Sequence, residues 1–143
     1  MRLNMDCVRD ILLCVEEHTG LRKSCRFVDS NSSEIAEFLG IEESLPDYQQ
    51  DLLEKYDNDT LIYHVNYCIR ADLIIPLQAS DANSIIIQDL TISGHNFLCD
   101  IREHQNWKTI KKIAGNIGST SLSSFTSIAS DVISNLIKTQ ITG

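Results

Sequence analysis

Apolar residues recur every three or four positions along much of the chain, and each such stretch predicts an amphipathic helix. The first stretch follows Asn4, a typical N-cap residue, and Asp6 adds a negative charge to the first turn. Gly20 is placed to end this helix in a left-handed cap. The buried stripe is predicted to consist of Met5, Val8, Ile11, Leu12 and Val15.

Two further helices are predicted from the middle of the chain, with a third, shorter helical segment between them. Residues 31–40 carry the Asn-x-x-Glu pattern of a capping box, and residues 48–56 fit a helical turn or two. The longer helix spans 59–71, with Asp57 or Asp59 as its cap.

Strand patterns flank these helices. Residues 21–29 fit a short extended segment, and two β-branched runs, 73–77 and 84–90, predict a hairpin around the polar loop 78–83. Pro76 restricts its strand to an edge of the sheet or to a position where no backbone donor is missed, because proline cannot donate to a central ladder.

Three C-terminal helices complete the pattern. They are predicted over 92–103, with Thr91 as cap, over 106–116, and over 119–139. The last helix either packs onto the rest of the chain or forms a dimer interface. Its apolar seam consists of Leu122, Phe125, Ala129, Val132 and Leu136.

This order of elements predicts a mostly helical α+β protein in which residues 1–143 form one domain. A helix that leads directly into a two-stranded hairpin is typical of a winged helix-turn-helix, here with extra C-terminal helices. In that fold the helix 59–71 is the recognition helix and the hairpin is the wing.

Several segments carry a resemblance to a known family. Residues 61–74 look like the third helix and first wing strand of bacterial winged-helix regulators, with Asp72 where glycine is usual; aspartate tolerates the left-handed conformation moderately well. Together with 89–98, 3–12 and Trp107-Lys108, they resemble the domain of unknown function 2513 family, common in bacterial genomes and prophages. The resemblance covers about residues 3–138 and implies a winged-helix core but no activity.

The charge distribution bears on the function that this fold suggests. The net charge of -8 lies wholly in residues 1–60, with 6 Lys/Arg and 14 Asp/Glu, whereas residues 61–143 hold six of each. Ten acids and only Lys55 fall within 29–59, a deficit for phosphate binding. The alternative is therefore a protein-interaction module in which Glu42, Glu43, Asp47 and Asp51 bind a basic partner.

The predicted recognition helix nevertheless offers side chains suited to double-stranded DNA. Asparagine and arginine read base edges, and tyrosine reaches phosphates. The candidates are Thr60, Tyr63, His64, Asn66, Tyr67 and Arg70. A regulatory, non-enzymatic DNA-binding protein, dimerised through 119–139, is the first hypothesis.

Other chemistry finds little support in the sequence. The apolar runs are too short to span a membrane, and no secretory signal is visible, so a cytoplasmic protein is expected. Five widely spaced cysteines without a CxxC pair predict mostly buried, reduced thiols. The pairs His64/Cys68 and His95/Cys99 are better explained by packing than by a metal, and no catalytic motif or cofactor signature is present.

Overall fold

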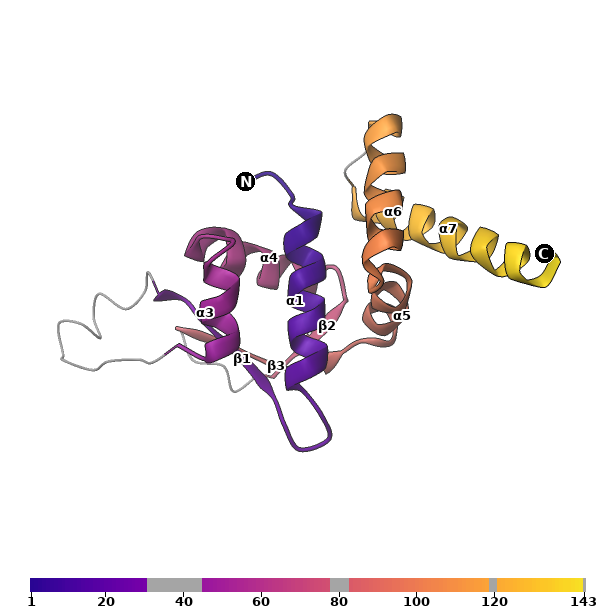
Figure 1. Cartoon of the computed structure of the whole chain (residues 1–143). Coiled ribbons are helices and arrows are strands. Elements are labelled where there is room, and N and C mark those ends of the chain that lie inside the picture. The colour runs from indigo at the N-terminus through magenta and orange to yellow at the C-terminus, as the bar shows by residue number, and fades with distance from the viewer. Residues whose placement is uncertain (31–44, 78–82, 119–120, 143) are drawn as a thin grey trace, which may run out of the picture.

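The computed structural model describes residues 1–30, 45–77, 83–118 and 121–142, and it shows the predicted mostly helical α+β fold (Figure 1). The predicted helix at 31–40 lies outside the described residues. In chain order the elements are α1 (Met5–His18), β1 (Cys25–Val28), α3 (Asp47–Leu53), α4 (Asn58–Arg70), β2 (Ile74–Pro76), β3 (Ser84–Leu90), α5 (Ile92–Ile101), α6 (His104–Ile117) and α7 (Leu122–Thr142). Among the described residues, no helix is both long and apolar enough to cross a membrane.

α1 forms as the sequence predicts at its start but not at its end. The Asn4 side chain accepts a hydrogen bond from the backbone N–H of Cys7, and the predicted stripe is buried. The helix ends at Thr19 in extended backbone. Gly20 is not a left-handed cap: it pairs with Lys23 in a tight turn that leads into β1.

The three strands form an antiparallel sheet in the order β1-β3-β2. β1 pairs with β3 around Cys25 and Ile87, and β2 pairs with β3 around Ile74 and Leu90. Pro76 lies in the edge strand β2, as predicted, beside a register irregularity. On the other side of β3, the free edge of β1 is covered by the buried Gln49 of α3, whose amide exchanges two hydrogen bonds with the backbone of Val28 (2.8 and 2.6 Å).

α4 is joined tightly to the hairpin. Asp57 caps it by accepting from the N–H of Thr60 at 2.7 Å, and after Arg70 the chain reverses through Asp72 at φ 59°, the left-handed conformation expected there. Thr91 then fixes the exit of the hairpin, because its hydroxyl donates to the carbonyl of Asp72 (2.6 Å) and accepts from the N–H of Gly94 (2.9 Å). Hydrogen bonds of Thr91 thus hold the end of α4 and the start of α5 together beside β2.

The C-terminal helices pack beside this sheet and α1. α6 starts at a cap formed by Glu103 and ends at Gly118, whose φ of 80° requires glycine. The start of α7 packs on α5 and α6 through Phe125, Ile128 and Ala129, and its remainder extends away from the body (Figure 1). The predicted seam is therefore buried only in its first part, and Leu136 is exposed.

Candidate functional site

The outward face of α4 brings together five of the six side chains predicted to contact DNA. Thr60, Tyr63, Asn66, Tyr67 and Arg70 follow the i, i+3, i+4, i+7 spacing, and each is exposed or half-buried. The guanidinium of Arg70 lies 5.7 Å from the centre of the Tyr63 ring, a cation–π contact that orders both side chains on the surface. The face is polar, with one fixed cation.

His64 does not belong to this face, and its assignment as a contact residue is wrong. It is fully buried, and its Nε2 accepts a hydrogen bond from the backbone N–H of Asn4 at 2.8 Å. Its Nδ1 donates to the carbonyl of Thr60 at 2.7 Å. Because a carbonyl only accepts and a backbone N–H only donates, these partners define the neutral tautomer. His64 is a structural link between α4 and the start of α1.

Two acids lie at the N-terminal end of α4. Asp57 is used as the cap, and its hydrogen bonds to Thr60 hold the pKa of its carboxyl below the usual value. Asp59 is exposed and lies on the same side of the helix as Tyr63 and Asn66 by helical spacing. A phosphate approaching this end meets negative charge, so the favourable end of the face is the one that carries Arg70.

The four acids of the alternative hypothesis are only partly described by the structure. Glu42 and Glu43 lie outside the described residues, whereas Asp47 and Asp51 are exposed on α3. Asp51 also lines an open pocket of about 230 Å³ together with Glu17 and Asp10 of α1. The Asp10 carboxylate accepts from the hydroxyl of Tyr56 at 2.7 Å, and Lys55 lies 3.6 Å away. Asp10, Glu17 and Asp51 therefore lie together beside α1 and α3, and none of them is on α4.

A further cluster joins the start of α1 to α6, and the sequence did not predict it. The Asp6 carboxylate accepts from the indole N–H of Trp107 at 2.8 Å and from the ammonium of Lys111 at 3.0 Å. Burial alone would raise the pKa of the Asp6 carboxyl, but these two donors lower it, and the net pKa is below the usual value. A pairing between residues about a hundred positions apart leaves no local signal in the sequence.

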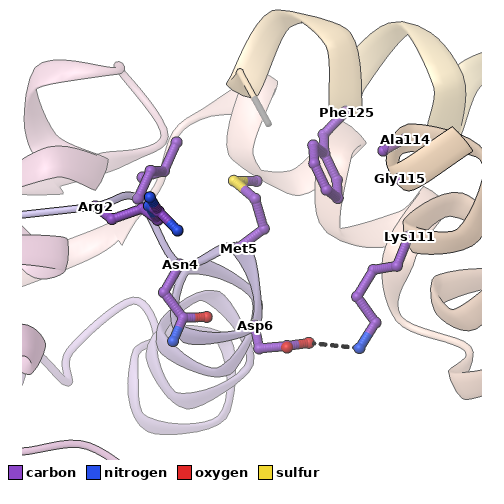
Figure 2. Close-up of a pocket in the computed structure, with 9 residues that line it drawn as sticks. Arg2, Asn4, Met5, Asp6, Lys111, Ala114, Gly115 and Phe125 are labelled. Atoms are coloured by element: carbon purple, nitrogen blue, oxygen red, sulfur yellow. Dashed lines mark hydrogen bonds and ion pairs between the residues drawn. The ribbon is translucent and has the colours of Figure 1, made fainter. Parts of the chain in front are cut away.

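Next to this cluster lies an open pocket of about 460 Å³ between the chain start, α6 and α7. Figure 2 shows Phe125 of α7 and Lys111 of α6 on one side, with Arg2, Asn4 and Met5 on the other. The ion pair between Lys111 and Asp6 closes one flank. This pocket is larger than the acidic one. Its lining combines apolar side chains with polar and charged ones: Leu3, Met5, Ala114 and Phe125 with Arg2, Asn4, Asp6 and Lys111.

Four of the five cysteines are buried, as predicted, and Cys99 is exposed. Burial raises the pKa of the Cys7 thiol to about 12 and raises the pKa of the Cys68 thiol as well, so both are unreactive packing residues. Within the part of the chain that the structure describes, no group of three or more His, Cys, Asp or Glu side chains could hold a metal ion. His64 and Cys68 each have a packing role instead.

Fold and surface together define a small, mostly helical α+β protein with a polar helix face beside a hairpin. The family model described as "Hypothetical protein (DUF2513)" matches residues 2–121, and the chain belongs to this family. The match ends where α7 begins, so α7 lies beyond it. No curated protein and no solved structure matches the chain.

Proposed function

We propose that the protein is a non-enzymatic, cytoplasmic DNA-binding regulator with a winged-helix core, in which α4 is the recognition helix. The observation that carries this proposal is the order of elements: α4 leads directly into the β2–β3 hairpin, and β1 completes a sheet with β3 in the centre. A winged helix places a helix and a wing beside one another to contact the major groove and the flanking backbone.

The outward face of α4 supplies two kinds of contact. Arg70 and Asn66 are exposed, and their side chains pair bidentately with guanine and adenine edges, respectively. Tyr63 and Thr60 carry hydroxyls that reach phosphate oxygens. Because α4 carries a single arginine against the exposed Asp59, most of the free energy of binding would come from base contacts and fit rather than from phosphate neutralisation.

The test is a titration of fluorescent double-stranded DNA, first a random pool and then sequences selected from it, at about 50 mM salt. The variant Asn66→Ala/Arg70→Ala removes the two base-reading side chains and should weaken binding of a selected sequence by about tenfold or more. Lys108→Ala, an exposed change on α6, is the matched control and should leave affinity within about twofold. Absence of binding to every pool would reject the proposal.

A dimer would give such a regulator two recognition helices, and α7 supports that arrangement. Beyond its packed start it exposes Leu136, Ile137 and Ile141, which are 45%, 54% and 79% accessible. We therefore propose a homodimer joined through α7. Light scattering after size-exclusion chromatography should give twice the chain mass, and Leu136→Ser/Ile137→Ser should return the mass of one chain.

A second candidate function rests on the acids that gather beside α1 and α3. Asp47 and Asp51 are exposed on one helix, and Asp51 shares a pocket with Glu17. A basic protein partner would be recognised by this surface. Asp47→Asn/Asp51→Asn should then lower the recovery of a partner from host lysate, whereas Asn66→Ala/Arg70→Ala should not. Equal recovery of the partner by wild type and by both double variants would exclude this function.

A further inference from the structure

The pocket between the chain start, α6 and α7 has the size and lining of a small-molecule site. Its volume of about 460 Å³ falls within the ~300–1,000 Å³ of typical ligand pockets. The apolar part of its lining consists of Leu3, Met5, Ala114 and Phe125, and Gly115 also borders it. An apolar body of moderate size would displace water from these walls, which favours binding.

The charges at the pocket select the polar end of such a molecule. Lys111 is neutralised by Asp6, which its ammonium contacts at 3.0 Å. Arg2 also lines the pocket, and it makes no ion pair with any carboxylate of the described residues. The pocket therefore combines apolar walls with one uncompensated positive charge, which is complementary to a single anionic group.

We infer that this pocket binds a small organic anion with an apolar body, such as a medium-chain or aromatic carboxylate. The site is separate from the proposed DNA contact, because none of its lining residues is on α4. It is nevertheless linked to α4, since the lining residue Asn4 donates its backbone N–H to His64. A bound anion stabilises the folded chain by mass action.

Gly115 allows the pocket to be filled without disturbing its surroundings. A Cβ placed on Gly115 meets no atom within 4 Å. The residue lies within α6, where glycine is a weaker helix former than alanine or leucine. Because Gly115 borders the pocket, Gly115→Leu adds a side chain at its edge without a clash at Cβ. Gly115→Ala makes the same gain in helix propensity while leaving the pocket largely open, and it is the matched control.

The experiment uses the full chain and 1-anilinonaphthalene-8-sulfonate, an aromatic anion whose fluorescence rises on binding, with octanoate, octanol and octylamine as competitors. Octanoate should displace the dye better than octanol, and octylamine should be weakest. Gly115→Leu should weaken dye and octanoate binding about tenfold or more, and Gly115→Ala should stay within about twofold. Circular dichroism and thermal melting establish that each variant is folded.

A second variant tests the charge alone. Arg2 is exposed and precedes the first helix, so Arg2→Gln leaves the fold intact; it should weaken octanoate by about two- to fivefold and leave octanol unchanged. Two results would overturn the inference: equal affinity of wild type and Gly115→Leu, or loss of the dye signal in Ile137→Ser/Ile141→Ser alone, which would place the dye on the exposed part of α7. Equal displacement by octanoate and octylamine would also overturn it.

Discussion

α1 and α7 contribute to the same hydrophobic core but are covered by it to different extents. The buried residues of α1 run from Met5 to Val15, nearly the whole helix, whereas those of α7 run only from Phe125 to Ala129. Both helices carry apolar residues at helical spacing. An apolar stripe at helical spacing therefore indicates which face of a helix is to be buried, whereas the neighbouring elements determine how much of that face is covered.

The largest expected difference in stability between α1 and α7 comes from replacing one isoleucine in each helix. Ile11 is fully buried, so Ile11→Ala should lower the free energy of unfolding by about 4 kcal/mol through lost burial and the cavity left behind. Ile137 is exposed, and Ile137→Ala should change the free energy of unfolding by less than about 0.5 kcal/mol. Urea unfolding followed by Trp107 fluorescence measures both, below the concentration at which the protein self-associates.

Similar losses in the two variants would mean that α7 is covered in solution along its length. In that case the loss for Ile137→Ala should grow with protein concentration, because a contact between chains depends on concentration whereas a contact within one chain does not. This dependence separates a dimer from closer packing of α7 on its own chain.

The next effect concerns the bond that holds the start of α1. His64→Ala should lower the free energy of unfolding by about 3 kcal/mol, since it removes a buried ring and leaves the N–H of Asn4 without its acceptor. His95 provides the control: it is exposed on α5, 3.6 Å from Asp89, and His95→Ala should cost less than about 0.5 kcal/mol. Equal costs would show that the Asn4–His64 bond contributes nothing.

His64 also shows which features of the fold local sequence patterns can predict and which they cannot. Local rules predict a helix at 59–71, with Asp57 or Asp59 as its cap, and allow Pro76 at an edge of the sheet; the structure shows the helix at Asn58–Arg70, the cap at Asp57 and Pro76 in the edge strand. The left-handed Asp72 follows from the resemblance, in which glycine is usual at this position, and the structure shows this conformation. The burial of His64 depends on a backbone donor sixty residues away. Its polarity suggested the surface, although helical spacing from Leu61 and Cys68 places it on the buried side.

The same distinction applies to the candidate sites: residues on one helix could be predicted, whereas clusters formed by two elements could not. Asn66 and Arg70 were identified because their positions on one helix fix their common face. The cluster of Asp6, Trp107 and Lys111 was not, because its members come from two helices whose packing no local pattern encodes. Gln49 was missed for a similar reason: a buried amide is explained only by the strand edge of β1 that it completes.

Two threonines provide a smaller comparison between the body and α7. Thr91 caps α5 and also bonds to Asp72, so Thr91→Ala should lower the free energy of unfolding by about 1–2 kcal/mol. Thr126 lies within α7 and bonds only to the carbonyl of Ser123 one turn earlier. Because alanine is the better helix former, Thr126→Ala should be neutral or stabilising by a few tenths of a kcal/mol. Thermal unfolding by circular dichroism compares the two, and a larger loss for Thr126→Ala would contradict the comparison.

The smallest effect depends on pH and acts where α1 meets α6. The pKa of Asp6 is lowered in the folded chain by Trp107 and Lys111, so its contribution to stability is present above the unfolded pKa of about 3.9 and disappears as pH falls through the lower folded value. Asp6→Asn should therefore be less stable than wild type at pH 7, by under about 1 kcal/mol because the carboxylate is partly exposed. The difference should shrink in acid below about pH 4.

Lys111→Gln identifies the source of that pH dependence. The Asp6 carboxylate keeps its bond from Trp107 in this variant but loses the ammonium, so the acid-dependent effect of Asp6→Asn should be smaller in Lys111→Gln than in wild type. Urea unfolding of the four proteins of this cycle at pH 7 and pH 3 gives the coupling directly. If the coupling is the same at both pH values, the Asp6–Lys111 pair does not stabilise the junction, and α1 is held to α6 by the Trp107 bond and apolar packing alone.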